Sequence, residues 1–469
     1  MGNEDFKLPP RWHCRSLVDC TKGGNISYGI VQPGQHQDDG IGIIRVNNIQ
    51  NGKISVADVL KVSHDIESKF SKTRLEGGEV LLTLVGSTGL SAITTKDLHG
   101  WNVARAIAVI KPSDEISAEW IHICLQSPYT KYFLDSRANT TVQKTLNLKD
   151  VKEIPLPIPP IEERMNLEKI YFDLDNKINL NLGINQTLEQ MSQTLFKSWF
   201  VDFDPVIDNA LDAGNPIPEA LQSRAELRQK IRNSADFKPL PADIRALFPA
   251  DLEETEMGWV PKGWKNGNLS DITKILSGFA FKSKDFGDDG KSVIKIKNIT
   301  IAKTIDIDDT QKISEIIAKD ANRFLLLDGD ILMAMTGATV GKFGVLATKN
   351  NEEYYLNQRV AKFETEKKAY LYCVLNQEST DRFITNTAQG SAQPNISAKD
   401  ILSTPLLIPS AELINTFNDF ISHLFYRMIA NTKANLTLTN LRDTLLPKLI
   451  SGELSLEDLP DLVDQTEPA

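Results

Sequence analysis

The hydrophobic and polar positions of the chain follow one pattern as far as Pro159 and repeat it as far as Pro409. In each stretch, short β-branched runs alternate with Gly, Asn and Asp turns. This pattern predicts a mixed sheet with a few helices, one of them over residues 117–134. After each proline the spacing of the apolar residues becomes helical. The sequence therefore predicts two α/β domains, each followed by one long helix.

Four segments of the first half recur in the second half at an offset close to 250 residues. Leu8–Trp12 recurs as Val260–Trp264, Ile44–Ile49 as Ile294–Ile299, Gly78–Leu82 as Gly329–Met333, and Lys149–Val151 as Lys399–Ile401. A single repeat of this length indicates a duplicated domain rather than a solenoid.

The two helical segments each carry one narrow apolar seam that also contains asparagines. In the first, the seam residues are Leu167, Ile170, Leu174, Ile178, Leu182, Leu188, Met191, Leu195 and Trp199, with Asn181 and Asn185. In the second, they are Phe417, Phe420, Leu424, Met428, Leu438, Leu441 and Leu445, with Asn431 and Asn435. Each helix would span roughly 40 residues, or about 60 Å.

A helix with such a narrow seam cannot bury it alone, and the obvious partner is the other repeat. We expect an antiparallel intramolecular coiled coil with the domains at its opposite ends, related by a pseudo-two-fold axis. The seam asparagines would face each other and set the register, because a buried amide pair tolerates one alignment. Two separate helices on unrelated cores are the alternative. Gly183 is a mild objection to the first helix, since it costs about 1 kcal/mol against Ala.

Composition indicates a multidomain protein without membrane attachment. The chain has 469 residues, 41% of them hydrophobic, which is enough for two or three cores. It has no uncharged apolar run of about 18 residues, and Met1–Asp5 does not resemble a signal peptide. We therefore expect a cytoplasmic protein. The scattered Cys14, Cys20, Cys124 and Cys373 are interpreted as reduced structural thiols, with no metal site.

The net charge of -10 is unevenly distributed along the chain. Residues 205–256 hold ten acids and six bases, and residues 453–469 hold six acids and no base. The rest of the chain is therefore neutral on average, with local clusters of lysine. Such a body can bind DNA, although we expect it to need a basic partner for tight binding.

The sequence lacks the motifs of the enzymes that act on DNA. It has neither a phosphate-binding G-x-x-x-x-G-K-[ST] loop nor the glycine-rich turn and Asp/Asn-Pro-Pro-aromatic tetrapeptide of an amino-methyltransferase. The acid pairs Asp38-Asp39, Asp288-Asp289 and Asp308-Asp309 are best interpreted as solvated turn residues. The six histidines form no nucleophile motif. We therefore expect no catalytic residue.

Five segments together resemble the specificity subunits of type I restriction-modification systems. They are Met191–Val206 (MSQTLFKSWFVDFDPV), Leu445–Leu454 (LLPKLISGEL), Ile26–Gly34 (ISYGIVQPG), Ser277–Ser283 (SGFAFKS) and Leu156–Pro160 (LPIPP). The resemblance covers essentially the whole chain, and the duplicated layout strengthens it.

This resemblance implies an α+β fold with a pseudo-two-fold internal repeat. It places target-recognition domains at 1–159 and 257–409, a central helical region at 160–204 and a C-terminal one at 410–452. Residues 205–256 would be an acidic, Pro-rich insert or linker, and 453–469 an acidic tail. The partners it implies are double-stranded DNA, two methyltransferase subunits and restriction-translocase subunits. S-adenosylmethionine, ATP and Mg would lie on those partners, with no cofactor on this chain.

Residues for both kinds of contact can be named. The candidate DNA-binding residues are Gly86, Ser87, Thr88, Arg105, Thr141, Gln143, Lys144, Lys295, Lys297, Gly337, Thr339, Gln358, Arg359, Gln389, Ser391 and Gln393. The candidate methyltransferase-docking residues are Leu174, Ile178, Leu188, Leu195, Trp199, Leu424, Leu438, Leu441 and Leu445. Because the two halves have diverged, an asymmetric bipartite target is expected. The alternatives are a two-lobed adaptor that binds only protein and a fused enzyme with an unfamiliar active site.

Overall fold

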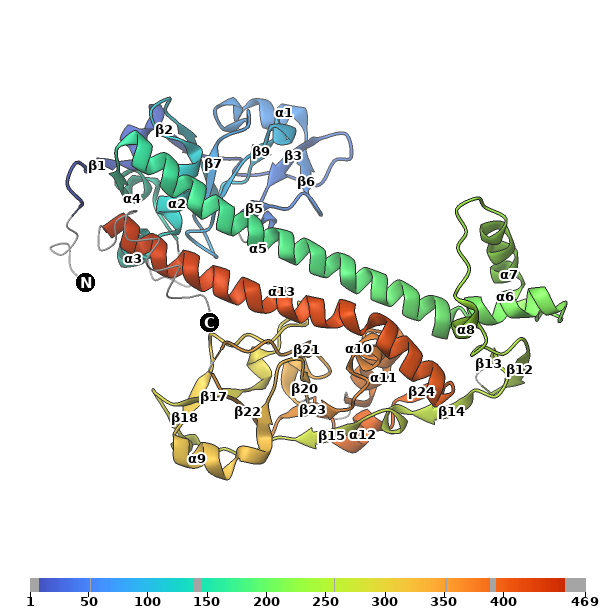
Figure 1. Ribbon diagram of the computed structural model, residues 1–469. Coiled ribbons are helices and arrows are strands. Elements are labelled where there is room, and N and C mark those ends of the chain that lie inside the picture. Colours follow the sequence, from blue (N-terminus) through green and yellow to red (C-terminus); the bar gives the residue numbers. More distant parts are fainter. Residues whose placement is uncertain are drawn as a thin grey trace. The chain divides into compact units, whose positions relative to one another are not determined.

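The computed structural model describes residues 8–50, 52–137, 145–256, 258–350, 352–388 and 394–451 (Figure 1). The chain folds as two compact units. One holds the chain up to Asn176 together with Leu438 onward, and the other is Lys177–Thr437. Two long helices, α5 (Ile161–Phe196) and α13 (Ala411–Ser451), contribute to both units. Within these ranges, no helix is both long and apolar enough to span a bilayer.

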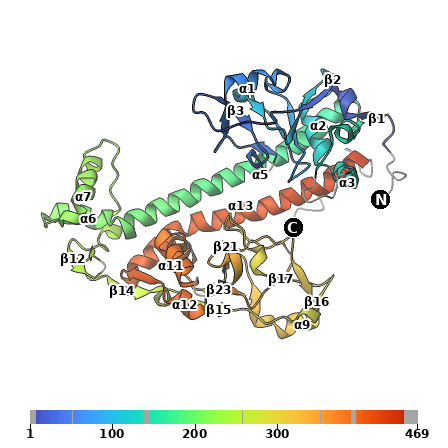
Figure 2. The same cartoon turned by 180° about the vertical axis from the view of Figure 1, so that it is seen from behind.

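The first unit contains an α/β domain built on a four-stranded antiparallel sheet in the order β2-β10-β7-β8. A second sheet, β6-β3-β9, includes the parallel pair β3 and β9, and two ribbons pair β1 with β11 and β4 with β5. Helix α2 packs on the four-stranded sheet (Figure 2). The strands are β1 (His13–Ser16), β2 (Thr21–Tyr28), β3 (Ile41–Ile44), β4 (Ile49–Gln50), β5 (Lys53–Ile54), β6 (Leu60–Val62), β7 (Val80–Thr83), β8 (Ser91–Ile93), β9 (Asn102–Val103), β10 (Ile107–Pro112) and β11 (Pro155–Ile158). The helices are α1 (His64–Ser68), α2 (Ala118–Gln126), α3 (Pro128–Arg137) and α4 (Leu148–Lys152).

The second unit repeats the plan of this domain, with a larger second sheet. Its four-stranded sheet has the order β15-β23-β20-β21, and its second sheet, β16-β18-β17-β22-β19, contains the parallel pair β17 and β22. The strands are β14 (Lys265–Asn268), β15 (Lys274–Ser277), β16 (Phe286–Gly287), β17 (Lys291–Ile294), β18 (Gln311–Ile313), β19 (Leu325–Leu326), β20 (Ile331–Ala334), β21 (Phe343–Val345), β22 (Tyr354–Leu356), β23 (Val360–Glu364) and β24 (Pro405–Ile408). The helices are α9 (Glu315–Asp320), α10 (Lys368–Leu375), α11 (Glu378–Ala388) and α12 (Ala398–Leu402). The internal repeat predicted from the sequence is confirmed.

The helix predicted over 117–134 is instead two helices, α2 and α3. Helix α2 ends at Ser127, whose backbone is extended (φ -63°, ψ 147°). Pro128 begins α3, and a residue before proline avoids the helical region for steric reasons. The apolar period continues across this break, so spacing alone does not show it.

The antiparallel pairing of the long helices is set by asparagines within the Lys177–Thr437 unit. Asn181 Nδ2 donates to Asn435 Oδ1 at 2.8 Å, and Asn431 Nδ2 donates to Asn185 Oδ1 at 2.8 Å. Asn435 Nδ2 also donates to the Ile178 carbonyl at 3.2 Å. As the residue number rises along α5, it falls along α13, so the helices run in opposite directions. The predicted coiled coil with facing asparagines is confirmed.

The seam itself differs from the predicted one at three positions. Leu182 and Met191 are 49% and 48% exposed on α5, and Phe420 is 41% exposed on α13. The buried and half-buried positions step by three or four through Ile178, Asn181, Asn185, Leu188, Ser192, Leu195 and Trp199. The prediction passed over Ser192, a polar residue that lies in the seam and is 2% exposed.

A single Asn435→Leu substitution should destabilise the helix pair. It removes the acceptor of the buried Asn181 amide, and an unpaired buried polar group costs about 1–3 kcal/mol. Urea unfolding should show this loss. Asn181→Leu combined with Asn435→Leu should recover most of it, because no amide is then left unpaired. Gln186→Leu, on the exposed side of α5, is the control; an Asn435→Leu variant as stable as this control would contradict the prediction.

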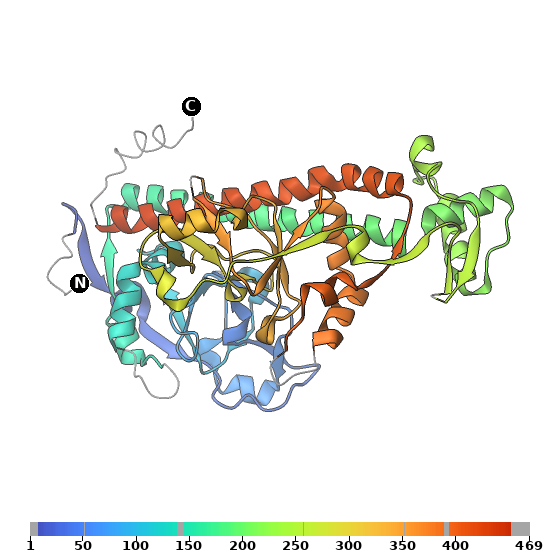
Figure 3. The same ribbon diagram turned by 90° about the horizontal axis from the view of Figure 1, so that it is seen from below.

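Residues 205–256, expected to be an insert or linker, form a folded element that follows the end of α5 (Figure 3). After a π-helical turn at Lys197–Val201 come α6 (Asp204–Ala213), α7 (Glu219–Arg232), α8 (Ala242–Arg245) and the ribbon of β12 (Leu252–Thr255) with β13 (Gly258–Pro261). Arg224 donates two hydrogen bonds of 2.7 Å to Asp204, and Arg228 pairs with Asp208 in the same way. These ion pairs join α6 to α7.

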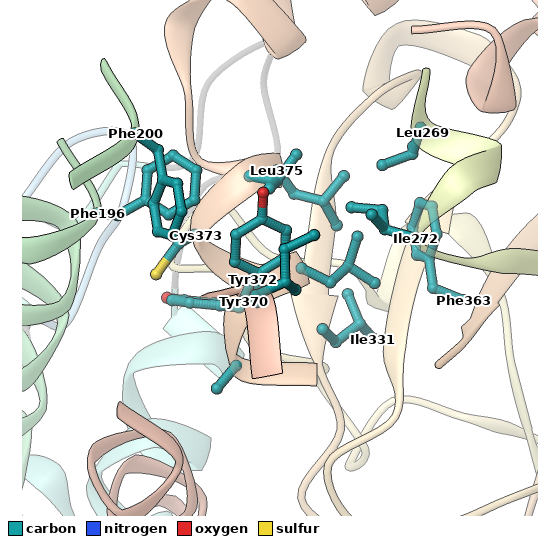
Figure 4. Close-up of a cluster of buried hydrophobic side chains, with 14 of the residues drawn as sticks. Phe196, Phe200, Leu269, Ile272, Ile331, Phe363, Tyr370, Tyr372, Cys373 and Leu375 are labelled. Carbon is teal, nitrogen blue, oxygen red and sulfur yellow. The ribbon is translucent and has the colours of Figure 1, made fainter. Parts of the chain in front are cut away.

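The insert, α5 and α13 share the main core of the second unit. Phe196 and Phe200 of the α5 end approach Tyr370 of α10, with ring centroids 5.6 and 5.4 Å apart (Figure 4). The ring centroid of Trp199 lies 5.2 Å from that of Phe248 in the insert and 5.1 Å from that of Phe417 in α13. One aromatic cluster thus joins the end of α5, the insert, α10 and the start of α13.

A buried histidine joins α2 to the long helices in the first unit. His122 is 4% exposed, and its Nδ1 lies 2.9 Å from Ser91 Oγ. The ring centroids of Tyr171 and Phe172 on α5 lie 6.1 and 6.3 Å from the ring centroid of His122. Burial, aided by the positive charge of Arg442, lowers the pKa of His122 to about 4 from its usual 6.5.

This histidine should make stability depend on pH. The unfolded chain binds a proton on His122 at a higher pH than the folded chain does. Stability is therefore complete above pH 6.5 and falls as the pH drops towards about 4, by up to roughly 3 kcal/mol. Urea unfolding at several pH values should give this slope in the wild type and a smaller one in His122→Asn. The exposed His423 gives the control His423→Asn, and an unchanged slope in His122→Asn would contradict the assignment.

Candidate nucleic-acid interface

Two predicted DNA-binding loops of the first domain meet at one end of its four-stranded sheet. The turn with Gly86, Ser87 and Thr88 follows β7, and Arg105 follows β9. The Leu84 amide at the end of β7 donates to the Ala106 carbonyl at 2.7 Å, which ties these loops together. Gly86 has a φ of +80°, a left-handed conformation that favours glycine, so the turn needs this residue.

The second domain builds the same arrangement from different residues. Gly337 and Thr339 lie in a 3-10 turn after β20, and Gln358 and Arg359 follow β22. The Met335 amide donates to the Arg359 carbonyl at 3.0 Å, the counterpart of the bond from Leu84 to Ala106. Gly337 repeats the left-handed backbone of Gly86, with a φ of +79°.

The third predicted loop of each domain lies outside the described residues: Thr141, Gln143 and Lys144 in one domain, and Gln389, Ser391 and Gln393 in the other. The chain next to it is anchored at the same sheet end. Leu146 donates its amide to the Leu84 carbonyl, and Ile396 donates its amide to the Met335 carbonyl, both at 2.9 Å. In each domain, one sheet end thus carries the two described loops and the chain that follows the third.

The side chains at these loop ends differ in their exposure to solvent. Ser87, Arg105, Gln358 and Arg359 are exposed, whereas Thr88 and Thr339 are half-buried. The Arg105 guanidinium lies 6.0 Å from the ring centre of Tyr28, which is itself 44% exposed. The DNA-binding residues predicted from the sequence do not include Tyr28. An aromatic residue in the glycine-containing segment Ile26–Gly34 was the signal that could have identified it.

The two predicted lysines of the second domain are engaged in internal contacts. Lys295 Nζ lies 3.6 Å from the ring centre of Phe286, and Lys297 Nζ lies 2.8 Å from Asp309 Oδ2. Burial and the charge of Lys297 lower the pKa of Lys295. These contacts hold the lysines in place but reduce the charge that they can offer to phosphate.

The predicted docking residues mostly serve internal packing. Trp199 and Leu424 are 1% and 8% exposed, so they do not offer their side chains to a partner. The others are half-buried: Leu174, Ile178, Leu188, Leu195, Leu438, Leu441 and Leu445. The apolar side chains exposed on α5 are instead Ile161, Met165, Leu180, Leu182 and Met191.

Across the ranges that the structure describes, no three His, Cys, Asp or Glu side chains come together in a group that could hold a metal ion.

Two copies of one α/β domain, each with loops gathered at a sheet end, and a pair of long antiparallel helices define an α+β protein with an internal repeat. The sequence matches the family described as type I restriction modification DNA specificity domain over residues 33–190 and 261–438, more than half of the chain. The chain therefore belongs to this family, as a specificity subunit.

Individual relatives agree with this assignment. The specificity subunit of the type I restriction enzyme HindI from Haemophilus influenzae is 28% identical over 439 residues, covering 88% of this chain and 94% of that protein. The EcoBI specificity subunit of Escherichia coli is 36% identical over 140 residues, 30% of this chain and 29% of that protein. The S subunit crystal structure from M. genitalium matches the fold with a TM-score of 0.51 at 13% identity, covering 96% of this chain and 97% of that one. The family resemblance inferred from the sequence is confirmed.

Proposed function

We propose that this chain selects the DNA target of a type I restriction-modification complex, and that it reads a bipartite target with two unlike halves. The duplicated loop-bearing sheet end carries the proposal. Its backbone is the same in both domains, but Arg105 stands in one where Gln358 stands in the other. Equal scaffolds with different exposed polar side chains suit two half-sites of different sequence.

We further infer that the chemistry lies on partner subunits. Two methyltransferase subunits would dock along the long helices, where Met165, Leu180 and Met191 are exposed. Restriction-translocase subunits would complete the complex. S-adenosylmethionine, ATP and Mg would belong to these partners. The pseudo-two-fold arrangement predicted from the repeat would let both loop ends reach one duplex, as paired half-site readers do.

Long-read methylation mapping tests this proposal directly. The chain is co-produced with its methyltransferase partner in a host that lacks adenine methylation at the sites concerned. A gapped motif with two different halves is the expected result. A continuous palindrome would contradict the two-reader proposal. An absence of methylation, with the complex intact, would favour the alternative of an adaptor that binds only protein.

A further inference from the structure

In the first domain, backbone hydrogen bonds fix the position of Arg105, whose side chain is exposed. Arg105 donates its amide to the Ile30 carbonyl at 2.8 Å, and Ile30 donates its amide to the Val103 carbonyl at 2.8 Å. Gly29 fits here because a Cβ atom would overlap the Val103 carbonyl. These contacts fix the backbone from which the Arg105 side chain projects.

Gln358 occupies the same position in the second domain. Its amide donates to the Phe279 carbonyl at 2.9 Å, and the Phe279 amide donates to the Leu356 carbonyl at 2.9 Å. Gly278 again allows the approach, because a Cβ atom would overlap the Asn357 carbonyl. With the bonds from Leu84 to Ala106 and from Met335 to Arg359, the hydrogen-bond pattern around the two positions is the same.

The two equivalent side chains are chemically different and both are exposed. Within the described ranges, neither side chain forms an ion pair or a hydrogen bond. Two other basic residues of these domains are engaged by contrast: Arg45 donates to the Asp58 carbonyl at 2.8 Å, and Lys297 binds Asp309. Arg105 and Gln358 therefore keep their donors for a ligand.

We propose that this position determines base specificity in each half-site: Arg105 contacts a guanine in one half and Gln358 contacts an adenine in the other. The inference rests on the proposed function. In the major groove, arginine donates two hydrogen bonds to O6 and N7 of guanine, whereas glutamine pairs with N6 and N7 of adenine. Tyr28 restricts the guanidinium of Arg105 by lying beside it, which reduces the ordering needed on binding.

A phosphate contact is the competing role for the same side chains. A phosphate contact strengthens binding to all sequences alike, so its loss lowers methylation at every site and leaves the motif unchanged. A base contact discriminates at one position of the target, by roughly 5- to 150-fold for a good bidentate pair. The two roles are therefore separated by the sequence of the motif rather than by the amount of methylation.

The experiment compares the methylated motifs of the intact methyltransferase complex carrying wild-type chain, Arg105→Gln or Gln358→Arg. Arg105→Gln should relax or change one guanine position of one half, with the preference for guanine there falling by roughly 5- to 150-fold. Gln358→Arg should alter one adenine position of the other half. In each variant the untouched half should stay as in the wild type, which also shows that the complex is folded.

Lys72→Gln, an exposed basic residue of the first domain outside the loop end, is the matched control and should leave the motif unchanged. The inference is overturned if both variants keep the wild-type motif at lower methylation, or if both abolish methylation without any relaxed position. It is also overturned if the wild-type halves lack the guanine and the adenine. A wild type without a gapped motif would instead refute the proposed function itself.

Discussion

Replacing Trp199 with alanine is expected to lower the stability of the second unit by about 3–5 kcal/mol, the usual range for removing a large buried aromatic side chain. Trp199 is 1% exposed and contacts rings from two other parts of the chain. Phe417 and Phe420 belong to α13, and Phe248 belongs to the insert. The cavity left by the missing indole ring should therefore destabilise the end of α5, the start of α13 and the insert together.

Hydrogen exchange suits this test because the two units need not unfold in one step. Amides at the end of α5 and in α8 should lose protection by roughly two to four powers of ten in Trp199→Ala. Leu182→Ala is the control, since Leu182 is 49% exposed and such surface changes stay within about 0.5 kcal/mol. Equal protection in the two variants would show that Trp199 does not join these segments.

The duplication, the long helices and their antiparallel pairing could all be predicted from the sequence. Repeated segments at a constant offset identify equivalent strands whatever the sheet order, and the periods of two and 3.6 residues separate strands from helices. The asparagines were informative because a buried amide needs a partner. The bond from Asn181 to Asn435 supplies that partner.

The error in the seam of α5 has a physical cause, a polar residue in a buried place. Ser192 lies in the seam and donates to the Leu188 carbonyl at 2.9 Å, so its hydroxyl needs no partner across the helices. A search for apolar residues passes over it and selects the exposed Met191 instead. In the candidate site, the positions of the loops after β7 and β20 could be predicted from the internal repeat. The hydrogen bond from the Leu84 amide to the Ala106 carbonyl could not be predicted, because it joins the two segments through the backbone alone.

The fold of the insert could not be predicted from its composition, because its net charge conceals how its charges pair. Asp204, Asp208 and Asp212 are four residues apart, and each binds an arginine 20 residues later in the chain. Two charged rows with helical spacing could have indicated a pair of packed helices. These three aspartate–arginine pairs form a charge ladder between α6 and α7. The excess of acidic over basic residues in 205–256 comes from residues outside this ladder.

Removing Arg228 should therefore unfold the insert rather than merely change a surface charge. The side chains of Arg228 and Asp208 are 14% and 10% exposed, and Arg228→Met leaves the Asp208 carboxylate buried without its guanidinium. Breaking one partner of a buried ion pair costs about 3–5 kcal/mol. Limited proteolysis between α6 and α8 should become markedly faster, and hydrogen exchange in α7 should rise.

A second substitution separates the charge from the packing. Arg228→Met with Asp208→Leu leaves no uncompensated charge, so it should regain most of the lost protection. Arg382→Met removes an exposed pair, with side chains 68% and 83% exposed at Arg382 and Glu378, and should cost less than about 0.5 kcal/mol. If Arg228→Met costs no more than Arg382→Met, the insert is held by the contact of Phe248 with Trp199 and not by its ladder. The effect of Trp199→Ala on the insert should then exceed that of any charge removed from it.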